Sequence, residues 1–219
     1  TGNKKKFTYK ELKDKVSKFA GALKNQDIKK GDRVIIYMPM IPEAVVAMLA
    51  CARIGAIHSV VFGGFASNEL ASRIDDSKAK LLVTASCGFE PGRTVEYKPL
   101  VDEAIKQAHH KISKMILFQR KGHEVKLNAP MEISWDEAHA NAKDTDCVEM
   151  SSNEFAYILY TSGTTGTPKG IVRDIGGHIV ALKWTMKNIY NIDEGDIWWS
   201  ASDIGWIVGH SYIVYAPLF

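Results

Sequence analysis

Short apolar runs alternate along the chain with segments in which apolar residues recur at every third or fourth position. The runs are rich in β-branched residues, as buried strands are. They predict strands at residues 34–38, 56–62, 81–85, 115–118 and 155–160. Strands that alternate with helices predict an α/β fold, in which a largely parallel sheet is flanked by helices.

Helices are predicted between these strands. Thr8 and Glu11 have the spacing of a capping box, which places a helix start at this point. The apolar residues that follow at helical spacing are Leu12, Val16, Phe19 and Leu23. Further helices are predicted at 42–54, at 67–76 with Ser67 as the N-cap, and at 99–109, with a short one after Ser134.

The last predicted strand runs into a segment dense in glycine and hydroxyl side chains. Residues 160–170 read Tyr-Thr-Ser-Gly-Thr-Thr-Gly-Thr-Pro-Lys-Gly, and such a concave set of donors suits phosphate oxygens, with Lys169 adding positive charge. An ordinary surface turn needs one or two glycines and no lysine. A Walker-type P-loop has Gly before its lysine and Ser or Thr after it, whereas Pro168 precedes Lys169 and Gly170 follows it. A phosphate-binding loop between two strands is therefore predicted.

Residues 160–170 resemble the signature loop of the adenylate-forming superfamily, which contains acyl-CoA synthetases, luciferases and peptide-synthetase adenylation domains. Two further segments resemble its short-chain branch, the acetyl- and propionyl-CoA synthetases. They are Val-Phe-Gly-Gly-Phe at 61–65 and Ser-Asp-Ile-Gly-Trp-Ile-Val-Gly-His-Ser-Tyr at 202–212. The resemblance extends over nearly the whole chain. It implies that ATP and a short carboxylate form an acyl-adenylate and pyrophosphate, after which CoA takes up the acyl group.

The resemblance assigns the loop to the phosphates of ATP. The expected donors are Thr161, Ser162, Thr164, Thr165 and Lys169, and Lys169 is the expected catalytic side chain because it stabilises phosphate charge. Gly163 and Gly166 would let the backbone approach the phosphates. No metal-ligand spacing occurs in the sequence, so Mg²⁺ is expected to arrive with ATP.

Residues 88–93, Gly-Phe-Glu-Pro-Gly-Arg, resemble the loop that binds the 3′-phosphorylated adenine end of CoA. The expected CoA contacts here are Glu90, Pro91, Gly92 and Arg93, with Arg93 able to pair with a phosphate. Taken alone, Arg93 is typical of a solvated turn. Acetyl-CoA synthetases usually carry a second arginine where Glu90 stands, so this form is closer to the propionyl branch.

The resemblance also predicts a channel and a pocket. Gly63 and Gly64 would line the pantetheine channel, together with Val208; the alternative for the glycines is a strand-to-helix turn. The residues assigned to the acyl pocket are Trp206, Ile207, Val208 and Gly209. The alternative for this segment is a packed core helix, and His210 is either a substrate contact or a structural residue. Val208 replaces a threonine common in acetyl-type enzymes, which favours propionate, although one methylene is worth only about 1–3 kcal/mol.

Composition adds limits to this interpretation. A chain of 219 residues with 46% hydrophobic content can bury a substantial core, and a net charge of +3 gives no reason to expect a nucleic-acid partner. No apolar run is long enough to span a bilayer, so no membrane partner is expected. The three cysteines form no Cys-x-x-Cys, which favours reduced thiols in the cytoplasm. A mitochondrial location is the alternative if a leader has been removed, and no oligomeric state is predicted.

The expected function is that of a short-chain acyl-CoA synthetase, an acid–thiol ligase that converts ATP, propionate or acetate, and CoA into acyl-CoA, AMP and pyrophosphate. The resemblance implies that residues 1–219 are part of the large N-terminal AMP-binding domain, and that a C-terminal domain with the adenylating lysine lies outside them. We therefore expect these residues alone to be inactive. Two alternatives stay open: an adenylating enzyme that serves a carrier protein, and a non-catalytic module that binds nucleotide or CoA.

Overall fold

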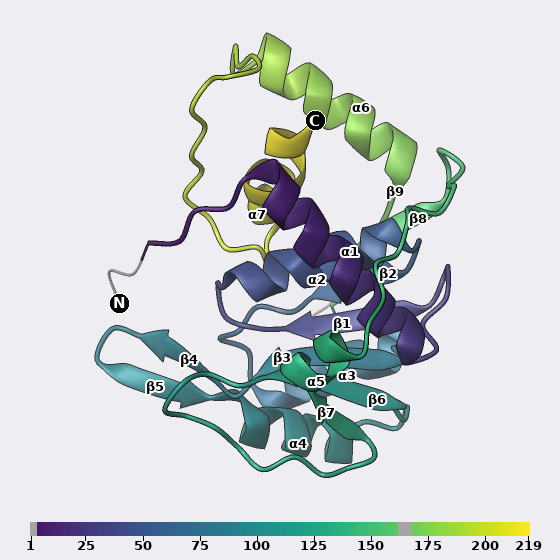
Figure 1. Cartoon of the computed structure of the whole chain (residues 1–219), viewed down its shortest axis with the longest axis vertical. Coiled ribbons are helices and arrows are strands. Elements are labelled where there is room, and N and C mark those ends of the chain that lie inside the picture. Colours follow the sequence, from purple (N-terminus) through teal and green to yellow (C-terminus); the bar gives the residue numbers. More distant parts are fainter. Residues whose placement is uncertain (1–3, 162–167) are drawn as a thin grey trace.

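The computed structural model describes residues 4–161 and 168–219. Its strands are β1 (Arg33–Tyr37), β2 (Ile57–Val60), β3 (Leu81–Ala85), β4 (Cys87–Glu90), β5 (Arg93–Glu96), β6 (Lys114–Phe118), β7 (Glu132–Ser134), β8 (Phe155–Thr161) and β9 (Lys169–Asp174). Within the described residues, seven of them form one sheet in the order β7-β6-β3-β1-β2-β8-β9, and β4 and β5 form a separate hairpin (Figure 1). Every neighbouring pair in the large sheet is parallel except β8 and β9, which confirms the predicted largely parallel sheet.

The helices are α1 (Tyr9–Asn25), α2 (Pro42–Arg53), α3 (Ser67–Ser77), α4 (Tyr97–Gln107), α5 (Trp135–Ala140), α6 (Ile175–Asn188) and the short α7 (Ile207–Gly209), which continues into a π-helical turn (His210–Tyr215) and a 3₁₀ turn (Ala216–Leu218). Helices α1, α2 and α5 contribute to the core on one face of the sheet, and α3 and α4 to the core on the other (Figure 1). None of the helices in the described ranges is both long and apolar enough to cross a membrane.

The central strand β1 shows why its sequence is apolar at every position. Val34 and Ile36 belong to the core beneath α1 and α2, whereas Ile35 and Tyr37 belong to the core beneath α3 and α4. All four side chains have no exposed surface. A strand that is covered on both faces reads as a continuous apolar run, because neither set of alternating side chains meets water.

Several predicted element ends are confirmed and others are wrong: β2, predicted at 56–62, spans only Ile57–Val60, and α4, predicted to end at residue 109, ends at Gln107. Thr8 caps α1 as predicted: its hydroxyl accepts from the Glu11 amide at 3.2 Å, and its own amide donates to the Glu11 carboxylate at 2.7 Å. The Ser134 hydroxyl likewise caps α5. Ser67 is not an N-cap, because Ala66 occupies that position and no side chain caps α3. Helix α4 begins at Tyr97 rather than at residue 99, since a proline is tolerated in the first helical turn.

The sequence patterns did not predict α6, the β4–β5 hairpin or β7. Helix α6 opens with Gly176 and Gly177, which lower helix propensity. Packing requires glycine at position 176, where a Cβ would lie 2.5 Å from the Ser152 Cβ and 2.9 Å from the Ser152 carbonyl oxygen; a Cβ at Gly177 would lie 2.7 Å from the Asp174 carboxylate that caps the helix. A close backbone approach therefore explains a pattern that is otherwise typical of a loop.

Candidate functional site

The topology gathers the predicted binding segments at one edge of the sheet. Strands β1, β2, β3, β6 and β8 are mutually parallel, so all of them end at the same side, which we call the carboxyl edge. The turn with Gly63 and Gly64 follows β2, the β4–β5 hairpin follows β3, and Thr161 ends β8. Ligands of such sheets bind beyond this edge, so three separately predicted segments lie where a common site is expected.

The β8–β9 hairpin carries both ends of the predicted phosphate loop. Thr161 and Lys169 are directly opposite each other across the two strands, and so are Tyr160 and Gly170. A Cβ at Gly170 would lie 3.2 Å from the Tyr160 ring and 3.0 Å from Ile158, so glycine leaves room for both side chains. Lys169 is exposed at the mouth of the loop. The other assigned residues, Ser162, Gly163, Thr164, Thr165 and Gly166, lie outside the described residues, and their roles stay predictions.

The turn after β2 is fixed by two buried tyrosines. The Tyr37 hydroxyl donates to the Phe65 carbonyl at 2.7 Å, and burial raises the pKa of Tyr37 to about 12, so the hydroxyl remains a donor at neutral pH. A Cβ at Gly63 would overlap the Tyr97 hydroxyl, and one at Gly64 would lie 2.5 Å from a neighbouring aromatic ring. The turn itself therefore requires glycine at both positions, whether or not pantetheine passes there.

The β4–β5 hairpin presents the predicted CoA residues at its tip. Glu90 and Arg93 are opposite each other, and the turn between them is Pro91-Gly92, with Gly92 at φ +77°. Arg93 donates to one Glu90 carboxylate oxygen from Nε at 2.7 Å and from Nη2 at 2.6 Å. The Arg93 side chain is 70% exposed. Such an exposed ion pair is weak, so a phosphate can compete for the guanidinium at small cost.

The predicted acyl wall lies beside the turn after β2. Trp206, Ile207 and Val208 are all exposed, at 46%, 44% and 44%. The Trp206 ring centroid lies 5.6 Å from that of Phe62 and 6.2 Å from that of Phe65. Gly209, by contrast, is buried, and a Cβ there would overlap the Asp203 carbonyl oxygen. The core-helix alternative thus fits Gly209, whereas the three larger side chains face outward as a wall would.

His210 lies in a buried group of histidine and tyrosine rings. The His210 ring has no exposed surface, and its centroid is 4.8 Å from that of Tyr157 and 5.4 Å from that of His58. Burial lowers the pKa of His210 to about 4. Nearby, His58 Nε2 and the Tyr215 hydroxyl are 2.6 Å apart. This position favours the structural alternative for His210.

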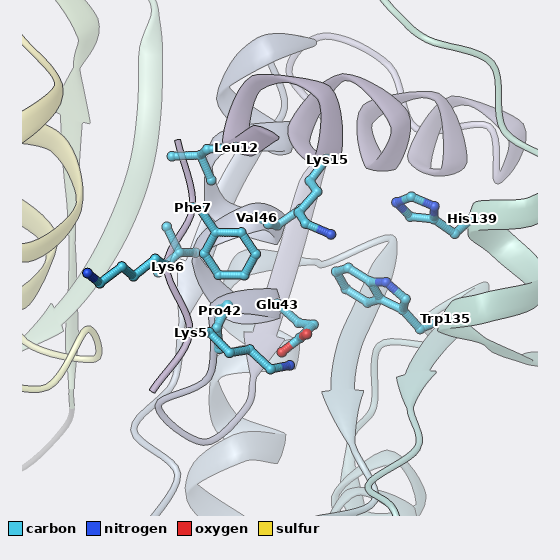
Figure 2. A pocket seen from close by; sticks show the side chains of 11 residues that line it. Lys5, Lys6, Phe7, Leu12, Lys15, Pro42, Glu43, Val46, Trp135 and His139 are labelled. Atoms are coloured by element: carbon cyan, nitrogen blue, oxygen red, sulfur yellow. The ribbon is translucent and has the colours of Figure 1, made fainter. Parts of the chain in front are cut away.

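A separate hollow of about 650 Å³ is lined by none of the predicted site residues (Figure 2). Helices α1, α2 and α5 supply most of its walls, and residues 5–7 close one side. Its lining combines the cations Lys5, Lys6 and Lys15 with apolar groups such as Trp135. Within residues 4–161 and 168–219, no group of three acidic, histidine or cysteine side chains is arranged to hold a metal.

The sequence patterns missed the side chains that support the carboxyl edge from behind. Tyr37 and Tyr97 hold the glycine turn, and Arg73 and Asp76 of α3 contact Tyr160 at the end of β8. One signal was available for Tyr37, because a tyrosine ends an otherwise aliphatic strand. Arg73 gave none, since an arginine in an amphipathic helix is typical of a solvated face.

Comparisons with known proteins agree with this arrangement. The family model described as AMP-binding enzyme matches residues 1–219. Acyl-CoA synthetase short-chain family member 3, mitochondrial, of Homo sapiens is 58% identical over the whole chain, which covers 32% of that relative. Acetyl-coenzyme A synthetase of Photobacterium profundum is 47% identical over 97% of the chain and is itself 33% covered. The solved acetoacetyl-CoA synthetase from Streptomyces lividans superimposes with a TM-score of 0.87 at 26% identity, over 96% of this chain and 32% of that one.

The chain spans about a third of the length of the curated relatives it matches. The family match, in contrast, covers every residue, and the predicted resemblance to adenylate-forming enzymes is confirmed by it. The chain therefore belongs to the AMP-binding enzyme family.

Proposed function

We propose that the chain is part of a short-chain acyl-CoA synthetase, which joins a short carboxylate to CoA through an acyl-adenylate at the expense of ATP. The observation that carries the proposal is the convergence of three segments on the carboxyl edge: the hairpin with Thr161 and Lys169, the turn with Gly63 and Gly64, and the tip with Arg93. The names of the relatives, short-chain acyl-CoA and acetyl-CoA synthetases, support the same reaction class.

In the first half-reaction, the carboxylate attacks the α-phosphate of ATP and pyrophosphate leaves. Negative charge grows on the departing phosphates, and a fixed cation with hydroxyl and amide donors lowers the energy of that state. Lys169 and Thr161 flank the loop as a cross-strand pair, so both point to the same neighbourhood. Mg²⁺ would accompany ATP and neutralise part of the phosphate charge.

In the second half-reaction, the CoA thiol attacks the acyl carbonyl and AMP leaves. Arg93 would bind the 3′-phosphate of CoA once that phosphate displaces Glu90 from the guanidinium. The pantetheine arm would then pass the turn at Gly63 and Gly64, which lies against Trp206 through the Phe62 and Phe65 rings. On this route the thiol would reach the proposed acyl wall.

The proposed acid is propionate rather than acetate. The exposed wall of Trp206, Ile207 and Val208 is apolar and excludes acids by size. A valine at position 208 offers no hydroxyl to a carboxylate, and Glu90 leaves Arg93 as the single arginine on the hairpin tip. Both features follow the propionyl branch of the resemblance.

The test uses the complete polypeptide that carries these residues, incubated with ATP, Mg²⁺ and CoA against acetate, propionate and butyrate. AMP and CoA thioester are measured together. We expect thioester with all three acids and the highest kcat/KM with propionate. If AMP and pyrophosphate form without any thioester, the CoA assignment is wrong and a carrier protein becomes the acceptor to test.

The compartment is also a proposal. Cys51 and Cys87 are buried free thiols and Cys147 is an exposed one, which suits a reducing compartment. The name of the human relative contains the word mitochondrial. We propose the cytoplasm or the mitochondrion, and fractionation of cells that express the complete polypeptide distinguishes the two.

A further inference from the structure

The guanidinium of Arg73 lies between two aromatic rings that belong to different parts of the carboxyl edge. Arg73 is on α3 and is only 5% exposed. Its Cζ lies 4.7 Å from the centroid of Phe65, in the turn after β2, and 5.3 Å from that of Tyr160, at the end of β8. Arginine stacks on aromatic faces through its planar, delocalised charge, and the attraction is stronger where water is excluded.

The charge of Arg73 is compensated within α3. Its Nη1 donates at 2.7 Å to a Glu69 carboxylate oxygen and at 2.7 Å to the Glu69 carbonyl. A buried cation without such a partner would be strongly destabilising. The ion pair with Glu69 therefore compensates the buried charge, while the guanidinium also lies against the Phe65 and Tyr160 rings.

On the β8 side, Tyr160 is held by two contacts. Besides the Arg73 contact, its hydroxyl donates to the Asp76 carboxylate at 2.7 Å. Asp76 is also on α3, so both contacts tie Tyr160 to one rigid helix. Tyr160 immediately precedes Thr161, which is opposite Lys169. Any shift of the Tyr160 ring therefore moves the strand end that carries the proposed ATP contacts.

On the other side, Phe65 belongs to the turn with Gly63 and Gly64. Its ring also packs edge-on against Trp206 at 6.2 Å, and its carbonyl accepts from the Tyr37 hydroxyl. The turn is thus held at Phe65 by two contacts: the Tyr37 hydroxyl donates to its carbonyl, and the Arg73 guanidinium lies against its ring. Arg73 is the one described residue that contacts both the turn and the end of β8 through ring stacking.

We propose that Arg73 is a positioning residue that holds the ATP-side strand end and the CoA-side turn in a fixed relation, so that one side chain supports both half-reactions. This inference rests on the proposed function. Arg73 is buried behind the carboxyl edge, so it acts on the proposed substrate sites only through its contacts with Tyr160 and Phe65.

The experiment separates the two half-reactions in the complete polypeptide. Carboxylate-dependent ATP–pyrophosphate exchange reports on the ATP side, and CoA-thioester formation at saturating ATP reports on the CoA side. For Arg73→Met we expect KM for ATP in the first assay and KM for CoA in the second to rise about tenfold each, the change that losing a buried stack of this kind produces. Tyr160→Phe should raise only the ATP value, and Phe65→Leu only the CoA value.

Two further variants exclude a merely structural role. Arg33→Ala removes hydrogen bonds to the Ser77 and Lys78 carbonyls at the C-terminal end of α3, so it weakens the same helix without removing a contact that either ring makes. It should lower Tm and leave both KM values unchanged. Arg73→Lys keeps the charge but not the planar group, and we expect it to restore neither KM.

The outcomes are distinct. If Arg73→Met lowers Tm as Arg33→Ala does and leaves both KM values unchanged, Arg73 is structural and the inference is overturned. If only one KM changes, the link between the two sides is overturned, and full recovery in Arg73→Lys overturns the stacking argument. A wild-type protein that forms no thioester with any short acid defeats the proposed function itself, and that result is read before any variant is made.

Discussion

Lowering the pH should destabilise the fold well before its carboxylates are protonated. The buried ring group contains His58, His178 and His210, and burial lowers the pKa of all three, to about 4 for His178 and for His210. These histidines stay neutral in the folded state, whereas the unfolded chain protonates them near pH 6.5. Their contribution to stability is therefore complete above pH 6.5 and is lost as the pH falls from 6.5 towards 4.

The loss of unfolding free energy can be calculated from the pKa of each histidine in the unfolded and in the folded state. For His210, which has no exposed surface, a shift from 6.5 to about 4 implies a loss of about 2 kcal/mol between pH 7.5 and pH 5. His178 is 8% exposed and shares a hydrogen-bond contact of 3.2 Å with the Tyr157 hydroxyl. It contributes in the same direction, so the loss for the group exceeds that for His210 alone and is a large part of a typical domain stability.

The assay is urea unfolding of the 219-residue chain, followed by tryptophan fluorescence at fixed ionic strength from pH 7.5 to pH 5.0. The midpoint should fall steadily below pH 6.5 while the slope m stays constant. His210→Phe replaces one buried ring by another and removes one titrating group, so its loss over this range should be smaller by about 2 kcal/mol. His123→Gln, at an exposed position, is the matched control and should behave as the wild type does.

Acid titration of carboxylates does not produce the same result. Those with lowered pKa values, such as Asp75 and Glu154, protonate in the unfolded chain only near or below pH 4.5. Between pH 5 and pH 6.5, the change in unfolding free energy therefore comes from protonation of the histidines in the unfolded chain. A free energy of unfolding that stays level from pH 7.5 to pH 5, or an identical pH slope in His210→Phe and wild type, would show that the buried rings are not held neutral.

Three substitutions test other parts of the structure. Gly209→Ala forces a Cβ against the Asp203 carbonyl and should cost about 1–3 kcal/mol of unfolding free energy; an unchanged urea midpoint would mean that the close approach is absent. Glu90→Gln frees Arg93 from its exposed ion pair and should strengthen CoA binding about two- to fivefold in calorimetric titration, whereas equal affinity would show that the pair does not compete with CoA. Lys169→Met should slow ATP–pyrophosphate exchange by about 10²–10³ with stability unchanged within about 0.5 kcal/mol, and a retained rate would remove Lys169 from phosphate stabilisation.

The fold was predictable where burial leaves a clear pattern. Strand β1 is apolar at four successive positions because both of its faces are covered, and the capping box at Thr8 gave a helix start to the residue. Helix α6 was not predictable, because Gly176 in its first turn is dictated by contact with Ser152, a distant residue that no local pattern reveals. The hairpin β4–β5 was not predictable either, because β4 is buried only at its first two residues and β5 is largely exposed, so neither strand shows the alternation of a half-buried sheet.

The candidate site was predictable only on its ligand-facing side. Glycine-rich and charged segments such as the one ending at Lys169 stand out because few other structures require them. The supporting residues do not stand out. Arg73 has the sequence context of a solvated helix face, and only the three-dimensional structure puts Phe65 and Tyr160 on either side of it. Such contacts cannot be read from the sequence, because the three residues come from α3, the turn after β2 and the end of β8.

Strand β9 carries a consequence for how the isolated chain behaves in solution. Among the described residues it pairs with β8 alone, which leaves its outer row of backbone N–H and C=O groups free of any strand neighbour. Ile171 and Val172 are 45% and 44% exposed on the same strand. An open strand edge that carries exposed apolar side chains is a template on which a second chain can add its own strand. Self-association at that edge would raise the apparent free energy of unfolding as the protein concentration rises. Unfolding measured at several dilutions, rather than in several buffers, therefore separates the stability of one chain from the stability of the contact between two copies.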